Sequence, residues 1–391
     1  MAAWVVRAGV VSIGSNSVSF IDTATNAVKH TAYVGRSPHE AFFTPDGREV
    51  WVSVRGEDYI AVLDGTTYQE KSRIRVPNGP GMVIFSPDGK LGYVASSFSP
   101  ETVVVSTADH SIVGRVKQDS PFSPDIAATP DGKQVWLTLK DVGRTMVFNA
   151  VAPFEVLRVL DTGPITNHVN FAHTAAGQFA YVTVGGLNQV KVFRTDDFGQ
   201  VAAIEVGALP HGLWPSGDGT RMFVGLENAD GAAVIDTAAN KVVATIPVGQ
   251  GPQGVAYVPG AVLEGPGTQN LQPLGVAANT ARLTLGAPKG APATQVTLFD
   301  QGLVQVLQAG ATGLEPRKPY VLGAVCRGVW RRHAAAAGGV HDQPGGCRGG
   351  QRHRANPPGR AGRRRPGTAR RTLVIAPGTA AAHGAPVQVQ Q

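Results

Sequence analysis

The chain has 391 residues, including 49 glycines and 28 prolines, and charged residues make up only 16% of it. So much glycine and proline favours many short strands over long helices, and no stretch approaches the ~18 uninterrupted apolar residues of a membrane-spanning helix. The net charge of +7 comes from one segment, residues 323–371, which holds 12 Arg and one acid, and the rest of the chain carries −4. A mildly acidic body argues against nucleic acid as a partner.

The chain opens with "MAAWVVRAGVVSIGSNS", which shows no secretory signal peptide, because it lacks a basic start and Arg7 interrupts the apolar run. Residues 15–35 instead match residues 230–249 closely, with "IDTATN" corresponding to "IDTAAN". With residues 9–13 added, this start predicts the second to fourth strands of a repeated unit.

That unit is first complete in "PHEAFFTPDGREVWVSV" at 38–54, where a proline-containing loop precedes two apolar runs separated by a polar turn. The pattern returns at Pro80, Pro124 and Pro210. Asp-Gly tolerates the positive φ of a tight hairpin, so each turn should join two antiparallel strands. The predicted structural turn residues are Asp46, Gly47, Asp88, Gly89, Asp131, Gly132, Asp218 and Gly219.

Two further apolar runs follow in every unit, so each unit is expected to be a four-stranded antiparallel meander. A sheet of this kind buries its faces only against its neighbours. The sequence therefore predicts an all-β fold, a β-propeller of six visible four-stranded blades. Residues 251–260 are expected to add a first strand beside the N-terminal strand and so close the ring. Trp51 and Trp136, at matching positions, are expected to pack between blades.

The words "YVTV" (181–184), "YVAS" (93–96) and the recurring Pro-Asp-Gly turns resemble the YVTN-type β-propeller repeat proteins over residues 9–260. The resemblance implies seven blades and an exported protein, periplasmic or secreted and often at the cell surface. This sequence departs from the pattern in its six units and in the signal peptide it does not show. A missing N-terminal stretch would explain both departures.

After Gly260 the period stops. The predicted organisation is a propeller at 1–260, a linker at 261–277, a small β-sandwich-like region at 278–322, an Arg/Gly-rich segment at 323–371 and a tail at 372–391. Strands are expected at 281–286, 294–300, 303–309 and 319–325. Leu314, Pro316 and Tyr320 are similar to the corner motif of fibronectin-like sandwiches.

The Arg/Gly-rich segment is interpreted as disordered or as the product of out-of-frame translation. RNA-binding tracts of this composition usually interleave aromatic residues, and only Trp330 is present. Zinc binding by Cys326 and Cys347 is not favoured, because the neighbouring histidines His333, His341 and His353 are irregularly spaced.

The candidate ligand- or metal-binding residues open the first strand of successive units: His39, Met82, Asp125, His168, His211 and Gln253. Equivalent positions of a propeller lie on one ring near the axis, so these side chains are expected around the mouth of a channel. Imidazoles from separate blades suit a transition metal. They are also similar to the ligand histidines in the loops of propellers of the cytochrome d1 and nitrous oxide reductase type, which makes haem an alternative ligand. The alternative is structural, with each polar residue hydrogen-bonding the next blade's loop.

Two functions follow as hypotheses. The first is a non-enzymatic scaffold of the cell envelope, a monomer without cofactor that binds a protein or small-molecule ligand on its loop face. The second is a metal- or haem-dependent oxidoreductase that uses the histidines. A propeller hydrolase such as a lactonase is disfavoured, because the ring lacks the acids that calcium needs.

Overall fold

The computed structural model describes residues 7–23, 25, 27–249 and 251–258, and strands between residues 280 and 390. The chain divides into two compact units, Met1–Ala278 and Asn279–Gln391. Among the described residues, no helix is long and apolar enough to cross a membrane.

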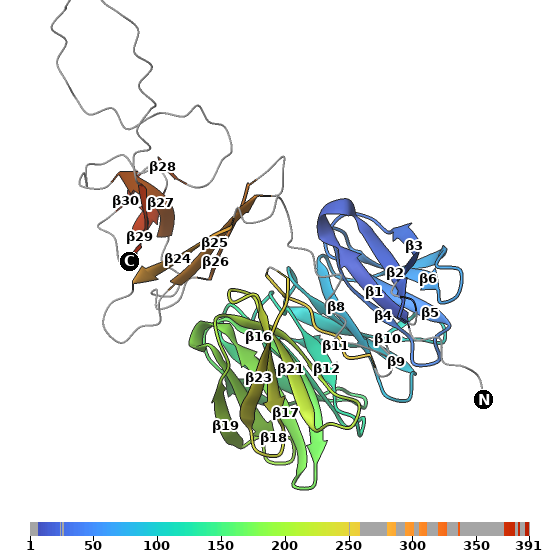
Figure 1. The fold of residues 1–391 in the computed structure, drawn as a ribbon. Helices are drawn as coiled ribbons and strands as arrows, with labels where there is room; N and C mark the ends of the chain where they lie inside the picture. The colour runs from blue at the N-terminus through green and yellow to red at the C-terminus, as the bar shows by residue number, and fades with distance from the viewer. Residues whose placement is uncertain are drawn as a thin grey trace, which may run out of the picture. The chain divides into compact units, whose positions relative to one another are not determined.

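The first unit is an all-β propeller with six blades, which follow one another from blue to olive in Figure 1. Blade 1 contains β1 (Arg7–Ser12), β2 (Ser17–Asp22) and β3 (Ala27–Tyr33). Blade 2 contains β4 (Pro38–Phe43), β5 (Glu49–Val54), β6 (Tyr59–Asp64) and β7 (Glu70–Arg75). Blade 3 contains β8 (Pro80–Phe85), β9 (Leu91–Ser96), β10 (Glu101–Ser106) and β11 (Ile112–Lys117).

The other three blades repeat the same four-stranded antiparallel order. Blade 4 contains β12 (Ile126–Ala128), β13 (Gln134–Leu139), β14 (Arg144–Asn149) and β15 (Val156–Asp161). Blade 5 contains β16 (Thr166–Thr174), β17 (Gly177–Val184), β18 (Gln189–Arg194) and β19 (Gln200–Glu205). Blade 6 contains β20 (Pro210–Pro215), β21 (Arg221–Leu226), β22 (Gly231–Asp236) and β23 (Lys241–Pro247). Two 3₁₀ turns, η1 (Ile13–Ser15) and η2 (Gly185–Leu187), join strands in blades 1 and 5.

The second unit is a separate β-sheet with strand order β26-β25-β24-β31-β29-β27-β28, and β30 pairs with β29. Its strands are β24 (Thr280–Gly286), β25 (Thr294–Asp300), β26 (Gln305–Gly310), β27 (Tyr320–Cys326), β28 (Ala335–Ala336), β29 (Arg371–Thr379), β30 (Ala382–His383) and β31 (Gln388–Gln390). The expected linker 261–277, the corner residues Leu314 and Pro316, and most of the Arg/Gly-rich segment lie outside the described residues.

The start of the propeller agrees with the sequence-based prediction, whereas its end does not. Blade 1 has three strands, as the N-terminal sequence predicts. The expectation of a closing strand at 251–260 was wrong, because the described residues 251–258 form no strand. Pro252 has no N–H to donate, and Gly251 and Gly254 lie close to it in the sequence, which disfavours a ladder. This segment lies against blade 6 instead: the Gln253 carbonyl accepts a 2.8 Å hydrogen bond from Gly212 N–H.

Aromatic side chains of the second strands connect neighbouring blades. The β5 and β6 side chains are almost all buried, whereas the fourth strand, β7, is largely exposed. A fully buried aromatic residue stands at the same place in four second strands: Trp51, Tyr93, Trp136 and Tyr181. Each reaches the next blade. The Trp51 ring lies 5.1 Å from that of Phe85, and Tyr93 Oη donates to the Ala150 carbonyl at 3.2 Å.

The hairpin turns between first and second strands share one arrangement. Asp46 accepts hydrogen bonds from Thr44 Oγ1 at 2.7 Å and Arg48 N–H at 3.1 Å, and Gly47 has a φ of 70°. The same pattern recurs at Asp88, Asp131 and Asp218, with left-handed Gly89, Gly132 and Gly219 following them. These turns therefore form from local chemistry that repeats with the unit.

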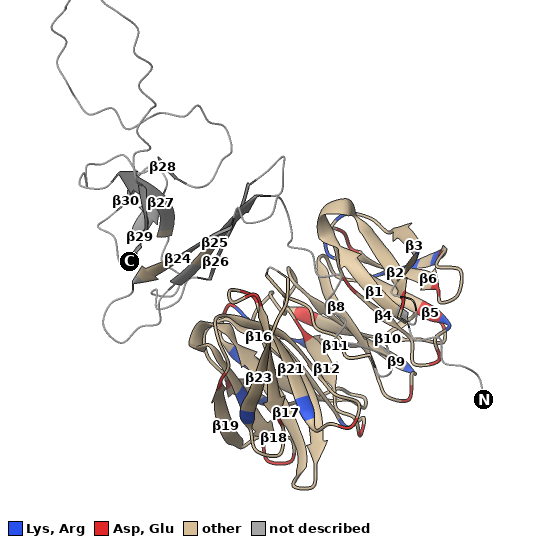
Figure 2. Cartoon of the chain, viewed as in Figure 1, with Lys and Arg blue, Asp and Glu red and all other residues tan. Residues whose placement is uncertain are grey.

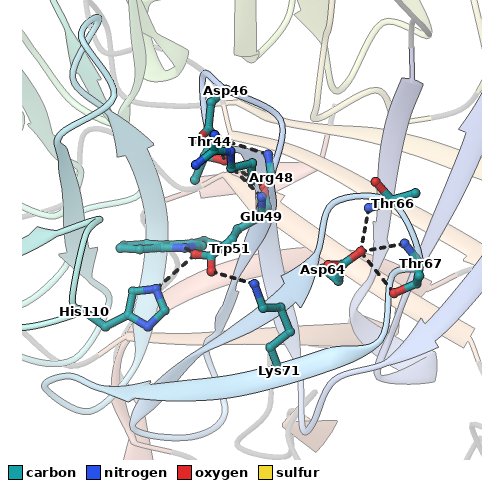
Figure 3. Close-up of polar contacts among 10 residues, drawn as sticks. All are labelled: Thr44, Asp46, Arg48, Glu49, Trp51, Asp64, Thr66, Thr67, Lys71 and His110. Atoms are coloured by element: carbon teal, nitrogen blue, oxygen red, sulfur yellow. Dashed lines mark hydrogen bonds and ion pairs between the residues drawn. The ribbon is translucent and has the colours of Figure 1, made fainter.

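A second set of polar contacts links blades 2 and 3 (Figure 3). Glu49 accepts hydrogen bonds from Trp51 Nε1 at 2.9 Å and Lys71 Nζ at 3.2 Å. The Nε2 atom of His110, which comes from blade 3, lies 3.0 Å from Glu49. In blade 4, Gln134 takes the same place: it accepts from Trp136 Nε1 and donates to the Thr195 carbonyl of blade 5, both at 2.9 Å.

We predict that Glu49→Ala destabilises the protein by about 1–3 kcal/mol, because it leaves the buried Trp51 N–H without an acceptor. Glu49→Gln should cost less, since glutamine fills this role in blade 4. Partial burial opposes the charged form of Glu49, but hydrogen bonds from Trp51, His110 and Lys71 prevail and lower its pKa below the ordinary 4.5.

A carboxyl whose folded pKa is depressed stabilises the fold above its unfolded pKa, and this stability is lost as pH falls through the folded value. Urea denaturation at neutral pH and below pH 4.5 measures both effects. Equal stability of the alanine and glutamine variants at neutral pH would contradict the assigned role.

Candidate functional site

The first strands of blades 2, 3, 5 and 6 begin with a bulge that sets two residues opposite one residue of the second strand. In blade 2, His39 and Glu40 lie opposite Ser53, between the pairs Pro38–Val54 and Ala41–Val52. The matching bulge pairs are Gly81 and Met82 in blade 3, Asn167 and His168 in blade 5, and His211 and Gly212 in blade 6. In blade 4, Asp125 immediately precedes Ile126, which pairs with Leu137.

This register places five of the six candidate residues at two adjacent positions at the start of the first strands. His39 and His211 take the first position, whereas Met82, Asp125 and His168 take the second. Gln253 follows the last blade. The structure differs here from the expectation of one ring, because an extra residue in a bulge shifts side-chain alternation without changing the repeat visibly.

The structure brings four of the six together and sets two apart. His39, Asp125, His168 and His211 interact with one another directly or through their charges. Met82 is buried and packs in the core cluster that contains Tyr93 and Phe148. Gln253 faces blade 6, where its Nε2 donates to Glu227 Oε1 at 2.8 Å.

Two of the three histidines are oriented by backbone carbonyls. His39 Nδ1 lies 2.7 Å from the Gly81 oxygen, and His211 Nδ1 lies 3.2 Å from the Gln253 oxygen. A carbonyl only accepts, so Nδ1 carries the proton in both rings and Nε2 keeps its lone pair. The rings of His168 and His211 are 4.8 Å apart between centroids.

All three imidazoles are held neutral. Burial, then the Arg55 charge, lowers the pKa of His39 to about 4. Burial, then the charge that His39 would carry, lowers the pKa of His168 to about 3. The pKa of His211 also falls well below its ordinary value, chiefly through burial. Neutral imidazole is the form that binds metals and accepts hydrogen bonds.

Two acids lie among the histidines, and burial opposes their ionisation. Asp125 is 3% exposed, accepts a 2.7 Å hydrogen bond from Val169 N–H, and has Oδ2 3.5 Å from His168 Nδ1. Burial raises the pKa of Asp125 well above its usual range, and the Glu40 charge adds to this. Burial raises the pKa of Glu40 to about 7.

A second set of residues directly follows the second strands of blades 2 to 6: Arg55, Ser97, Lys140, Gly185 and Glu227. Lys140 lies close enough to lower the pKa values of all three histidines. Burial lowers the pKa of Lys140 itself, with Glu227 opposing the shift. The repeat period would have aligned these residues, but each is of a different type, so no motif marked them.

Glu40→Gln should stabilise the protein at alkaline pH relative to acidic pH. A carboxyl with a raised folded pKa costs stability as pH rises from the ordinary 4.5 to about 7, because the unfolded chain ionises first. The amide removes that cost, which is on the order of 2 kcal/mol. Urea denaturation of both proteins at pH 5 and pH 8 checks this. A pH-independent difference between them would sink it.

The described residues contain no group of three or more His, Cys, Asp or Glu arranged to hold a metal ion. The free Nε2 lone pairs of His39 and His211 suit a different arrangement, in which one imidazole binds a metal whose other ligands come from a macrocycle. Elsewhere on the blades, acidic and basic residues are interspersed (Figure 2).

Blades of four antiparallel strands whose first strands converge on one polar site define a β-propeller protein. The chain belongs to the family described as lactonase, seven-bladed β-propeller, whose model matches residues 14–242. It is 28% identical to the seven-bladed β-propeller protein Rv1057 of Mycobacterium tuberculosis, over 66% of this chain and 62% of that protein. It is 24% identical to protein NirF of Stutzerimonas stutzeri, over 41% of this chain and 44% of that protein. The chain thus spans less than two thirds of either relative.

Solved structures show the same fold. Kuenenia stuttgartiensis hydrazine synthase matches with a TM-score of 0.57 and 22% identity, covering 63% of this chain and 85% of that one. A functionally unknown protein from Desulfotomaculum acetoxidans matches with a TM-score of 0.55 and 15% identity, covering 79% and 96%. Dihydro-heme d1 dehydrogenase NirN in complex with DHE matches with a TM-score of 0.50 and 16% identity, covering 80% and 74%.

Proposed function

We propose that this chain is a non-enzymatic, YVTN-type β-propeller that binds a small-molecule ligand where its first strands begin. The observation that carries the proposal is the convergence of His39, His168 and His211 from three blades, all neutral. All three side chains are partly exposed, and the Nε2 atoms of His39 and His211 are free to accept a hydrogen bond or bind a metal.

A buried acceptor beside them supports a ligand. Asn167 is fully buried, and its Nδ2 donates to the Pro210 carbonyl at 2.9 Å. Its Oδ1 has no hydrogen-bond partner among the described residues. A buried acceptor without a donor costs about 1–3 kcal/mol, and a donor on a bound ligand would remove that cost.

A metal tetrapyrrole is the ligand class we favour. One similar structure is a dihydro-heme d1 dehydrogenase with DHE bound, and a tetrapyrrole supplies the metal ligands that the described side chains do not. One of the three imidazoles would hold the metal axially. The bound group would bring redox chemistry, so a haem-dependent oxidoreductase is the second candidate.

The YVTN resemblance supports a place in the cell envelope, periplasmic or at the surface. The family name also raises lactone hydrolysis. That activity enters as an outcome of the test. Burial keeps Asp125 largely protonated and makes it a poor general base near neutral pH, whereas Glu40, with a pKa of about 7, is the residue that would serve as the base.

Haemin titrated into the purified full chain should bind with a Soret shift typical of imidazole ligation. His39→Ala and His211→Ala should each weaken binding about tenfold or more, through loss of an oriented ligand or its neighbour. His173→Ala is the matched control, because His173 is exposed on the same strand as His168.

Unfolding curves of each variant separate lost binding from lost folding. Identical haemin binding by wild type, His39→Ala and His211→Ala would refute the tetrapyrrole proposal. Lactone hydrolysis by the apo chain would refute the non-enzymatic assignment.

A further inference from the structure

Arg55 is a partly buried cation, and none of the ion pairs found between described residues includes it. Burial lowers its pKa. Its Nε atom is buried and has no hydrogen-bond partner among the described residues. An uncompensated charge and an unpaired donor both cost free energy, which makes the residue unusual unless something else occupies its N–H edge.

Two aromatic rings cover the guanidinium. Arg55 Cζ lies 5.5 Å from the Phe98 ring centroid and 5.6 Å from that of Phe122. These rings come from blade 3 and from the loop before blade 4, so Arg55 reaches beyond its own blade. With the cation held over two rings, its N–H edge is left for an in-plane acceptor.

Ser97 adds a second unpaired group. It takes the place in blade 3 that Arg55 takes in blade 2, directly after the second strand, and precedes Phe98. It is 4% exposed, and its Oγ has no partner among the described residues. A Cβ on Gly81 would lie only 2.6 Å from that Oγ, and the Gly81 carbonyl contacts His39 Nδ1. Ser97 and His39 therefore meet around Gly81.

Two cations lie on this side of the site. Arg55 and Lys140 are both close enough to His39 to lower its pKa. Glu227, the acid that acts on Lys140, already accepts a 2.8 Å hydrogen bond from Gln253 Nε2. An anion bound beside His39 would be attracted by both cations.

We propose that Arg55 and Ser97 form an oxyanion-binding subsite beside the three histidines, with Lys140 providing long-range attraction. A guanidinium edge and a hydroxyl are the donors that bind carboxylate or phosphate oxygens. The inference deepens the proposed function and rests on it for the position of the ligand. It requires that ligand to carry a carboxylate or phosphate group.

The test uses the full chain without haemin, so a failed haemin titration leaves it intact. Inorganic phosphate and succinate are titrated calorimetrically into wild type, Arg55→Gln and Arg115→Gln. Arg115 is the matched control, an exposed arginine already paired with Glu101 at 2.9 Å. We expect millimolar or tighter binding by wild type and the control, and at least about tenfold weaker binding by Arg55→Gln.

Ser97→Ala is a second variant in case the loss of Arg55 disturbs folding; we expect binding to weaken about threefold, through loss of one neutral hydrogen bond. Tighter binding of phosphate than of succinate would identify a phosphate ligand, and the reverse order a carboxylate. Binding by neither anion to wild type, or equal binding by wild type and Arg55→Gln, overturns the proposal.

Discussion

The architecture depends on buried aromatic side chains that stand at the centre of the second strands and contact the next blade. Replacing a residue of this kind by alanine typically costs about 3–5 kcal/mol. Each tryptophan satisfies its N–H within its own blade, through Glu49 or Gln134, while each tyrosine hydroxyl donates to the following blade. These contacts fix neighbouring blades in one orientation, and that orientation brings the starts of the first strands together.

Much of the propeller could be predicted because its signals are local and repeated. An Asp-Gly turn specifies its own hairpin, as Asp46 and Gly47 show, and the same chemistry recurs at Gly89, Gly132 and Gly219 and places the strands. The three-stranded start was also readable, since residues 15–35 match a later stretch of the chain. The closing segment was not, because Pro252 lacks the N–H that a strand ladder needs, and the Gln253 carbonyl accepts a hydrogen bond from blade 6 instead.

The site was predictable only in part. Histidines at repeat positions indicated the starts of the first strands as the candidate site. The bulges, however, determine which side chains lie at equivalent positions. No residue type at His39 or Asn167 marks a bulge in the sequence. Arg55 and Ser97 could not be predicted from the sequence, because what sets them apart is that Arg55 Nε and Ser97 Oγ have no hydrogen-bond partner among the described residues. An unpaired donor is a property of the packed molecule, and neither composition nor spacing reveals it.

The alternation of tryptophan and tyrosine also makes the blades unequal. The residue just before the aromatic position in the next blade is small where it follows a tryptophan, Gly92 after Trp51 and Ala180 after Trp136. It is larger where it follows a tyrosine, Val135 after Tyr93 and Met222 after Tyr181. A Cβ at Gly92 would lie 2.6 Å from the Trp51 ring. Each blade is thus matched to its two neighbours. A blade that is moved or duplicated would need new packing residues at both of its interfaces.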